Sequence, residues 1–285
     1  MVGAVLYGTR LTGREVKLMQ HLKFINPNLN SAGLPAFEQL SDDDLTKCAN
    51  NHAWYQAREG IQCERCRNLE VLFVYRDGER TSMSCPCQAR RNSLARARRA
   101  GLTDLLKRCT FDSFQVKQNW QRVAKTAVQN FVNDEKRGWL LLSGQSGCGK
   151  THLCTAAIGA FIERGQDVHV VRWVNDSTML KGLSSDTYER EKRLNAFKRA
   201  SVLLIDDLFK TQSNEKPTSA DVRLAYDLLN YRYENRSLIT MLSTERTISE
   251  LKQIDEAIGG RIYEMVKGYC LEIGGGEKNW RFQQQ

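Results

Sequence analysis

The stretch "LLLSGQSGCGKTHL", Leu140–Leu153, decides the fold of this chain. An apolar run enters a glycine-rich turn, and Gly144–Thr151 matches the pattern G-x-x-x-x-G-K-[S/T] at every fixed position. Glycines let the backbone turn tightly with its N–H groups facing inward, where they and the next helix N-terminus can hold phosphate oxygens. Lys150 is expected to reach the β- and γ-phosphates of a nucleotide, and the Thr151 hydroxyl to bind Mg²⁺. The predicted nucleotide-binding residues are Gly144, Gln145, Ser146, Gly147, Cys148, Gly149, Lys150, Thr151 and His152.

The sequence around this loop has the context that a phosphate-binding loop requires. "GWLLLSG" before the loop is typical of a strand, and "KTHLCTAAIGAFIERG" after it is typical of a helix. From about Gln118 onward, apolar strands alternate with helices. This alternation predicts an α/β fold with a parallel sheet that helices cover on both faces. The expected strands are 138–144, 167–174, 201–207, 237–243 and 267–273.

A second strand of this set, "SVLLIDD", ends in the adjacent carboxylates Asp206 and Asp207. A buried strand that ends in acids can hold a metal ion and a water molecule beside a bound nucleotide. We expect Asp206 to hold the Mg²⁺ shell and Asp207 to polarise the attacking water. The pair therefore favours hydrolysis of a nucleoside triphosphate over phosphoryl transfer to a small molecule.

Several motifs follow one another in an order that is specific to one family. They are "GQSGCGKTHL", "VLLIDDLFK", "LLNYRYENR", "LSTERTISEL", "IDEAIGGRI" and "KNWR". Through them the stretch Phe111–Arg281 resembles the AAA+ ATPases of the DnaC/DnaI type, the bacterial and phage loaders of replicative helicases, and most of all their phage or mobile-element branch. The resemblance implies a P-loop AAA+ sheet flanked by helices, with ATP and Mg²⁺ as cofactors and ATP hydrolysis as the reaction.

The resemblance also suggests residues that act beyond the phosphate loop. Arg261 in "GGRI" matches the arginine finger that reaches the ATP of a neighbouring subunit, and Arg281 in "NWR" matches a terminal arginine. Arg232 in "NYRYE" is a second trans-acting candidate, or else a stem that packs on aromatic rings. Ser243 and Thr244 end a strand where the family places its first γ-phosphate sensor, and Thr244 is the candidate. Many members have Asn in this region, whereas this chain has Glu245. The predicted catalytic residues are Lys150, Asp206, Asp207, Thr244 and Arg261.

Two cysteine pairs flank a predicted hairpin, "VLFVYRDGERTSMS", well before the phosphate loop. Four thiolates suit tetrahedral Zn²⁺, and C-x-x-C is a common spacing for its ligands. Because the second pair is a tight C-x-C, one ligand could instead be Cys109, Cys48 or His52, and four unrelated thiols are also possible. The predicted zinc ligands are Cys63, Cys66, Cys85 and Cys87.

The chain has nine cysteines and no evident export signal or membrane-length apolar run, which predicts a reducing, cytoplasmic location. Cys148, Cys154 and Cys270 are interpreted as packing residues. Three parts are expected: residues 1–58, an N-terminal helical region of unclear role; 59–109, a zinc-binding segment with a basic helix; and 110–285, the AAA+ ATPase domain. In the resembling family, a zinc-bearing N-terminal domain engages the helicase.

A formal net charge of +9 favours an acidic polymer as partner. Two segments concentrate the charge, "ARRNSLARARRAG" at 89–101 and "TYEREKRLNAFKRA" at 187–200. Each is either a solvated helix face or a contact for single-stranded DNA. The family links a helical insertion, which Met179–Ala200 matches in position, to single-stranded DNA.

These observations together predict an ATPase that loads a hexameric replicative helicase onto single-stranded DNA. ATP binding and hydrolysis would control assembly and release, and the chain would form a homo-oligomer in the loading complex without contacting a membrane. One alternative is a transposition helper ATPase of the IstB type, which lacks such a cysteine-rich region. The other is a nucleotide-gated adaptor that binds DNA and protein with little hydrolysis.

Overall fold

The computed structural model describes residues 5–6, 9–10, 41–77, 79–135, 138–183, 185–211 and 215–274. The chain forms two compact units, Met1–Arg91 and Asn92–Gln285, and the boundary between them falls within helix α3, Pro86–Arg99. The stretch "REVKLMQHLKFIN", residues 14–26, whose pattern predicts a helix, and the terminal Arg281 lie outside the described residues. The division into three parts at residues 58 and 109 remains a prediction.

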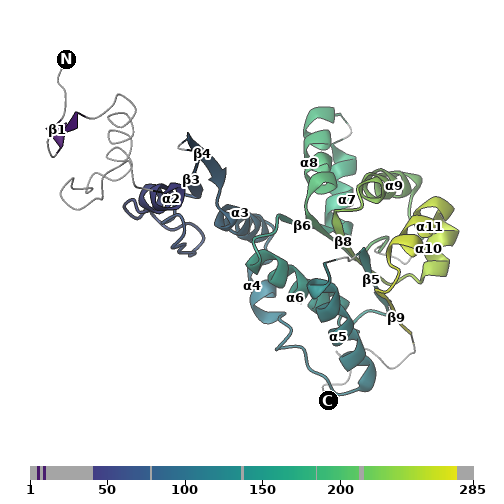
Figure 1. Cartoon of the computed structure of the whole chain (residues 1–285). Helices are drawn as coiled ribbons and strands as arrows, with labels where there is room; N and C mark the ends of the chain where they lie inside the picture. Colours follow the sequence, from purple (N-terminus) through teal and green to yellow (C-terminus); the bar gives the residue numbers. More distant parts are fainter. Residues whose placement is uncertain are drawn as a thin grey trace. The chain divides into compact units, whose positions relative to one another are not determined.

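The second unit contains a five-stranded parallel sheet in the order β6-β7-β8-β5-β9, which confirms the predicted α/β fold (Figure 1). Strand β5 lies between β8 and β9, so the phosphate loop leaves the sheet from an interior strand. The register pairs Leu141 with Leu242 on one side and with Cys270 on the other. The strands are β5 (Trp139–Gly144), β6 (Val168–Arg172), β7 (Val202–Asp206), β8 (Ile239–Thr244) and β9 (Cys270–Ile273).

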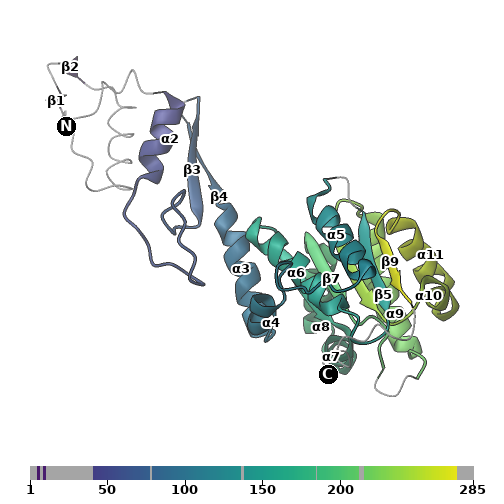
Figure 2. The same cartoon turned by 90° about the horizontal axis from the view of Figure 1, so that it is seen from below.

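Helices cover both faces of this sheet (Figure 1, Figure 2). Successive residues of β5 point to opposite faces, as the period of a strand requires. Leu140 and Leu142 therefore pack with α5 and α6, whereas Trp139 and Leu141 pack with the helices of the other face. The helices are α5 (Asn119–Asn133), α6 (Lys150–Glu163), α7 (Trp173–Gly182), α8 (Thr187–Arg199), α9 (Ser219–Glu234), α10 (Ile248–Ile254) and α11 (Glu256–Met265).

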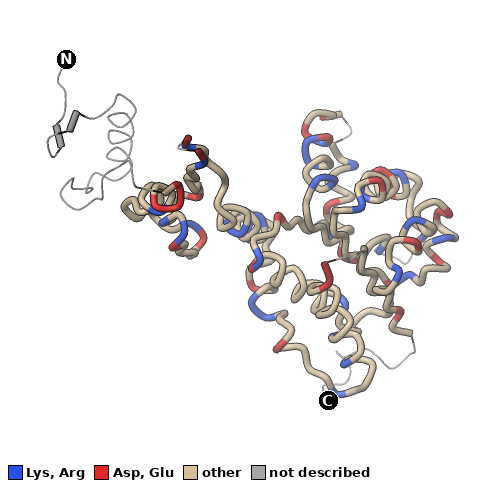
Figure 3. Tube along the Cα trace, in the orientation of Figure 1, with Lys and Arg blue, Asp and Glu red and all other residues tan. Residues whose placement is uncertain are grey.

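The basic segment "QARRNSLARARRAGLTDLLKR", residues 88–108, has a pattern that predicts a helix with a break near Gly101, and the structure confirms it. Helix α3 is followed by α4, Thr103–Arg108, and the break between them includes Gly101 at φ +67°. Lys and Arg recur along α3, α4 and α8 (Figure 3). Within the described part of the chain, no helix is long and apolar enough to cross a membrane.

The first unit consists of short elements. Helix α2 (Asp42–Asn50) follows a capping box in which Ser41 and Asp44 bond each other's backbone. The predicted hairpin is confirmed as β3 (Val71–Arg76) and β4 (Glu79–Ser84), and two further strands are β1 (Val5–Leu6) and β2 (Thr9–Arg10).

The pattern of "FEQLSDDDLTKCANNHAWYQ", residues 37–56, predicts a helix, but α2 ends at Asn50, earlier than this pattern indicates. The Asn50 side chain donates to the carbonyl of Phe73 at 2.7 Å and accepts from its N–H at 3.0 Å. These bonds fasten the last turn of α2 to β3. Long-range hydrogen bonds of this kind leave no trace in local sequence periodicity, which is why the helix length was overestimated.

Candidate nucleotide site and four-cysteine cluster

The phosphate loop has the conformation that its glycines allow. Gly144, Gly147 and Gly149 have φ values of +151°, +80° and +91°. A Cβ at Gly144 would lie 2.7 Å from the Ile273 carbonyl oxygen, and one at Gly149 would lie 2.9 Å from the Phe114 ring. Two of these positions therefore exclude side chains by close packing as well as by backbone angle.

Lys150 and Thr151 begin helix α6, directly behind the loop. The Lys150 ammonium is buried and donates to the carbonyls of Gly144 at 2.7 Å and Gln145 at 3.0 Å. The Thr151 hydroxyl lies 3.3 Å from Oδ1 of Asp206. The structure thus brings together the residues predicted to hold Mg²⁺, and a hydroxyl beside a carboxylate fits that ion's preference for oxygen ligands.

Asp206 ends strand β7 and lies among polar partners in a mostly buried place. The Ser243 hydroxyl donates to its Oδ1 at 2.5 Å. Burial raises the pKa of Asp206 and the adjacent Asp207 raises it further, while the hydroxyls of Ser243 and Thr151 act in the opposite direction. A nearby cation favours the ionised form of such a carboxyl group, so the environment of Asp206 suits a metal ion.

Asp207 has a left-handed backbone, with φ +58°, and Phe209 follows with φ +59°. The Asp207 N–H donates to Ser243 Oγ at 2.9 Å, which anchors this turn to β8. Its Oδ2 pairs with the Lys210 ammonium at 3.1 Å, and the same ammonium lies 3.0 Å from Oε1 of Glu245. Non-glycine residues in this region of φ are uncommon and recur at functional sites, where surrounding contacts maintain them.

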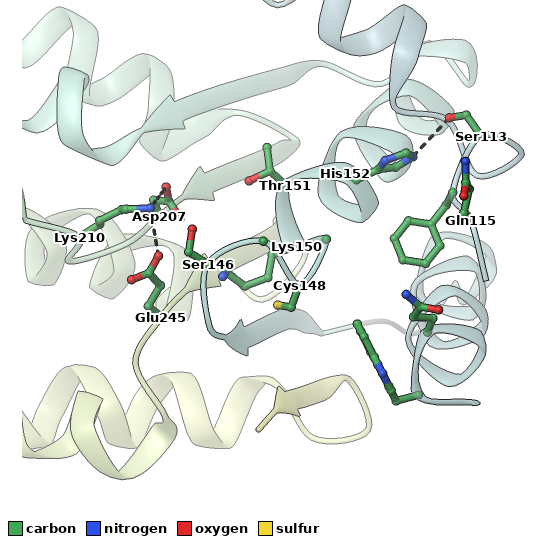
Figure 4. Close-up of a pocket in the computed structure, with 15 residues that line it drawn as sticks. Ser113, Gln115, Ser146, Cys148, Lys150, Thr151, His152, Asp207, Lys210 and Glu245 are labelled. Atoms are coloured by element: carbon green, nitrogen blue, oxygen red, sulfur yellow. Dashed lines mark hydrogen bonds and ion pairs between the residues drawn. The ribbon is translucent and has the colours of Figure 1, made fainter. Parts of the chain in front are cut away.

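A cavity of about 320 Å³ opens beside these residues (Figure 4). At its other end the Phe114 ring packs edge-on against His152, with 5.1 Å between ring centroids. The His152 Nε2 lies 2.9 Å from the Thr110 carbonyl oxygen. The lining residues are Ser113, Phe114, Gln115, Trp120, Gln121, Ser146, Gly147, Cys148, Gly149, Lys150, Thr151, His152, Asp207, Lys210 and Glu245.

Sequence reasoning missed the segment from Ser113 to Gln121 and also missed Lys210. The pattern of "CTFDSFQVKQ", residues 109–118, is typical of a linker, and "NWQRVAKTAVQNFVN" after it is typical of a helix, so neither stretch predicts a place in the site. Its only signal was Phe114, an aromatic residue shortly before a helix, which packs against the ring of His152. Lys210 is the last residue of the motif "VLLIDDLFK", three residues after Asp207, but the motif gave it no role.

The sensor prediction for Thr244 is wrong. Thr244 is fully buried, its hydroxyl donates to the Leu208 carbonyl at 2.8 Å, and it is not one of the described residues that line the cavity. Side chains alternate between the two faces of a strand. It is therefore the preceding Ser243 that contacts both Asp206 and Asp207, and the following Glu245 that lines the cavity.

The trans-acting candidate Arg232 is also wrong. Its side chain is 0% exposed, and burial lowers its pKa to about 10. A guanidinium enclosed in this way cannot reach a neighbouring subunit, and here it joins α9 to β8 and to the end of α8. Its acceptors are the hydroxyl of Thr240 and the carbonyls of Phe197, Lys198, Ala200 and Ile239.

Arg261 lies in a different setting on α11. Its guanidinium stacks over the rings of Tyr226 at 5.0 Å and Tyr233 at 5.5 Å, and Nη1 donates to the Ala257 carbonyl. Arg261 is part-exposed and is not among the described residues that line the cavity of its own chain. The structure thus leaves this arginine outside its own nucleotide site.

The four predicted cysteines come together in the first unit. Their sulfurs all lie within 4.8 Å of one another, with Cys63–Cys85 at 3.7 Å and Cys66–Cys87 at 3.5 Å. Tetrahedral Zn–S bonds of about 2.3 Å require sulfur–sulfur distances of about 3.8 Å, so the cluster fits this metal. Cys48, Cys109 and His52 are not in the group. Zinc would join the hairpin to the start of α3.

The electrostatics of the cluster also suit a metal. Burial opposes ionisation of the Cys63 thiol, but hydrogen bonds from the Cys66 backbone and from the three other thiols bring its pKa down to about 7. Burial, together with those same neighbours, raises the pKa of Cys87. A dication would remove this conflict by stabilising every thiolate.

Arg91 fixes the loop beside the cluster. It is fully buried and donates to Oε1 of Glu70 at 3.0 Å and to Oδ1 of Asn68 at 2.7 Å. The same Oδ1 accepts from the Cys63 N–H at 2.9 Å. This arginine of the basic segment therefore supports the cluster and is unavailable to a nucleic acid.

The remaining cysteines differ in burial. Cys148 and Cys154 are buried in the core, as predicted, and burial raises the pKa of each thiol. Cys270 is exposed on β9, so its interpretation as a packing residue is wrong. Strand β9 is at the edge of the sheet, where one face of a short strand can stay open to solvent.

The charges of α8 are partly compensated within the protein. Lys192 pairs with Glu189 at 2.9 Å, and Lys198 pairs with Asp227 of α9 at 2.5 Å. Tyr188 is 74% exposed near the start of the helix. The helix thus combines an exposed aromatic ring with cations, a combination that suits nucleic-acid binding.

Comparison with known proteins places this architecture in a family. The model described as "Bacterial DnaA ATPase domain" matches residues 105–267, more than half of the chain. The Phage-like element PBSX protein XkdC of Bacillus subtilis (strain 168) is 36% identical over 225 residues, 75% of this chain and 82% of that protein. The Replicative helicase loader DnaC of Escherichia coli (strain K12) is 23% identical over 174 residues, 59% of this chain and 67% of that protein.

Solved structures show the same fold. The DnaC helicase loader aligns with a TM-score of 0.50 and 24% identity, covering 56% of this chain and 94% of that one. AMPPCP-bound DnaA from Aquifex aeolicus aligns with a TM-score of 0.50 and 21% identity, covering 61% of this chain and 52% of that one. With the family match and the phosphate loop, these likenesses lead to one conclusion: the chain belongs to the DnaA/DnaC-type AAA+ ATPases.

Proposed function

We propose that this protein is an ATP-dependent loader that places a hexameric replicative helicase on single-stranded DNA. The observation that carries the proposal is that the predicted catalytic residues lie in two separate places on the chain. The phosphate loop and the Asp206–Asp207 pair line or border one cavity, while Arg261 lies outside it on α11. A site of this kind is completed by a neighbouring copy of the chain, so that ATP binding is linked to assembly.

The predicted nucleotide-binding and catalytic residues have the following proposed tasks. The loop N–H groups and Lys150 bind phosphate oxygens, and Thr151 and Asp206 hold Mg²⁺, which would neutralise charge on the β- and γ-phosphates. Asp207 orients the attacking water. Arg261 of the neighbour stabilises charge on the transferred phosphoryl group, and the stacked Tyr226 and Tyr233 hold its guanidinium ready.

The base of the nucleotide is proposed to lie at the Phe114 end of the cavity. Phe114 and His152 offer ring contacts there, and Gln115 offers an amide that can pair with the polar edge of a purine. The cavity lining includes Phe114, residues of the phosphate loop and Asp207. ATP is therefore the proposed ligand.

The chain is proposed to have three parts, 1–58, 59–109 and 110–285. The four-cysteine segment in the second part is proposed to bind zinc and to dock the helicase. Helices α7 and α8, including Met179–Ala200, are proposed to contact single-stranded DNA. Support for these roles comes from the cysteine geometry, from the exposed Tyr188 among basic residues, and from relatives that carry the name helicase loader. ATP binding would favour the loading assembly, and hydrolysis would release the loader.

Two single changes and their mixture test whether a neighbouring copy completes the site. Asp207→Asn and Arg261→Ala should each lower single-turnover ATP hydrolysis by roughly a hundredfold or more, measured with helicase and single-stranded DNA. Mixing the two variants should restore part of the rate, because the first supplies Arg261 to the intact site of the second. If neither change lowers turnover, the chain is an adaptor without meaningful hydrolysis.

The client is tested by affinity capture from the native host. The wild-type chain should recover a hexameric helicase, Cys63→Ser should lose it, and Cys109→Ser should retain it because Cys109 is outside the cluster. Recovery of a transposase in place of the helicase would refute the loader proposal.

A further inference from the structure

The edge of the cavity beyond Asp207 carries an ion pair that no motif of the phosphate loop predicts. Lys210 and Glu245 both line the cavity, and their charged atoms are 3.0 Å apart (Figure 4). The two residues come from different segments, one from the turn after β7 and the other from the end of β8. Glu245 occupies the region where many AAA+ ATPases have an asparagine.

A lone carboxylate at this edge would oppose the proposed ligand. The Glu245 side chain is 29% exposed and that of Lys210 is 34% exposed, so both charges are partly removed from water. Charges in such places interact more strongly than on an open surface. An unpaired Glu245 would repel an incoming phosphate, whereas the Lys210 ammonium cancels its charge.

The ammonium groups of Lys210 and Lys150 have different contacts. The Lys150 ammonium points back to the carbonyls of Gly144 and Gln145 within its own loop. Lys210 instead lies 3.1 Å from Oδ2 of Asp207, the group proposed to orient the attacking water. Because that water must stand in line with the terminal phosphorus of a triphosphate, Lys210 lies at the γ-phosphate end of the site.

We propose that the Lys210–Glu245 pair discriminates nucleoside triphosphate from diphosphate, with Lys210 binding the terminal phosphate and Glu245 holding its ammonium at that edge. This inference rests on the proposed ATP site. A diphosphate ends one phosphate short of Lys210, so the pair leaves ADP affinity unaffected. Glu245 is thus a positioning residue whose charge must stay matched by Lys210.

The pair predicts an order of affinities that follows the charge at this edge. Lys210→Met leaves Glu245 unpaired, Glu245→Gln leaves Lys210 unopposed, and the double variant is neutral like the wild type. The affinity for a non-hydrolysable ATP analogue with Mg²⁺ should fall by roughly tenfold or more in Lys210→Met, the size of a lost charged hydrogen bond. It should recover partly in the double variant. In Glu245→Gln the lost repulsion of phosphate offsets the lost positioning of Lys210, so affinity should stay within about twofold of wild type.

Titration calorimetry on the full chain, with the ATP analogue and with ADP, makes the test. ADP affinity should stay within about twofold of wild type in all four proteins, since a contact that is never made costs nothing. Lys216→Met is the matched control, because Lys216 is an exposed lysine of the same connection outside the cavity lining. Its affinity for both nucleotides should not change.

Each outcome has a distinct meaning. Equal loss of ATP-analogue and ADP affinity in Lys210→Met, or a ratio that is the same in all four proteins, overturns the role of the pair while leaving the nucleotide site intact. Failure of the wild-type chain to bind either nucleotide overturns the proposed function itself. The double variant restores charge balance. If its affinity for the ATP analogue also recovers, the loss in Lys210→Met is electrostatic and does not come from damage to the fold.

Discussion

The two units of this protein obtain their geometry in different ways. In the sheet unit, four consecutive residues of β5, Trp139–Leu142, are 0% exposed and belong to two large core clusters. Among the described residues of the first unit, one small cluster centres on Leu45, Ala49 and Tyr75, and another consists mainly of the cysteines themselves. A packed core holds the phosphate loop, whereas we expect the hairpin to depend on a metal ion bound by its thiols. Neighbouring units of one chain can therefore lose their structure for unrelated reasons.

Metal removal should produce the largest difference in stability between the two units. A strong chelator, or Cys66→Ser, should abolish amide-exchange protection in 41–91, because a core this small gains most of its folding free energy from the metal. Protection of the sheet unit should persist. Hydrogen exchange followed by mass spectrometry makes the comparison, with Cys109→Ser as control. Equal protection of 41–91 with and without chelator would mean that its core suffices.

The second prediction concerns the interior of the sheet unit. Arg232→Met should lower the free energy of unfolding by roughly 3–5 kcal/mol, because buried acceptors such as the Ile239 carbonyl lose their donor. Arg261→Met is the matched control and should cost about 1 kcal/mol or less, the size of a part-exposed cation–π contact. Denaturant titration measures both. Similar losses for the two arginines would show that burial does not separate them.

The third prediction is that the sheet unit is sensitive to mild acid. Burial and the nearby Arg96 lower the pKa of His169 to about 4, against the opposing effect of Asp167. A depressed pKa means that the unfolded chain takes up the proton first, so stability is complete above about pH 6.5 and falls as the pH drops towards 4. The loss should reach roughly 2–3 kcal/mol. His169→Gln should flatten this part of the curve in thermal unfolding followed across that range.

The smallest expected effects come from helix caps, which occur in both units. Ser41→Ala before α2 and Thr218→Ala before α9 each remove a hydroxyl that accepts from a backbone N–H at 3.2 Å. Each should cost about 1 kcal/mol. Thermal unfolding of the zinc-loaded chain, with local hydrogen exchange, should assign the first loss to the cysteine-rich unit and the second to the sheet unit. Spread of either loss to both units would indicate that they unfold together.

Local patterns predicted much of this molecule. The alternation of strands and helices predicted the sheet, and the loop glycines and the acid pair predicted that Thr151 lies near Asp206. Each of these patterns consists of residues that are close together in sequence. The packing of Phe114 on Gly149, the burial of Arg232 and the pair of Lys210 with Glu245 depend on distant segments. The sensor candidate Thr244 is buried, because neighbouring residues on a strand face opposite ways and sequence alone does not reveal which face lines the cavity.

The close contact between Gly144 and Ile273 has a consequence for when the nucleotide site forms during synthesis of the protein. The carbonyl of Ile273 closes over the first glycine of the phosphate loop, and β9 follows every other strand of the sheet in the sequence. During synthesis the loop is therefore translated long before the strand that packs over it. We expect the nascent chain to acquire its nucleotide affinity late, after β9 has emerged from the ribosome and joined β5. A ribosome-bound chain that ends before Cys270 would carry the whole phosphate-loop motif without the strand that covers its first glycine.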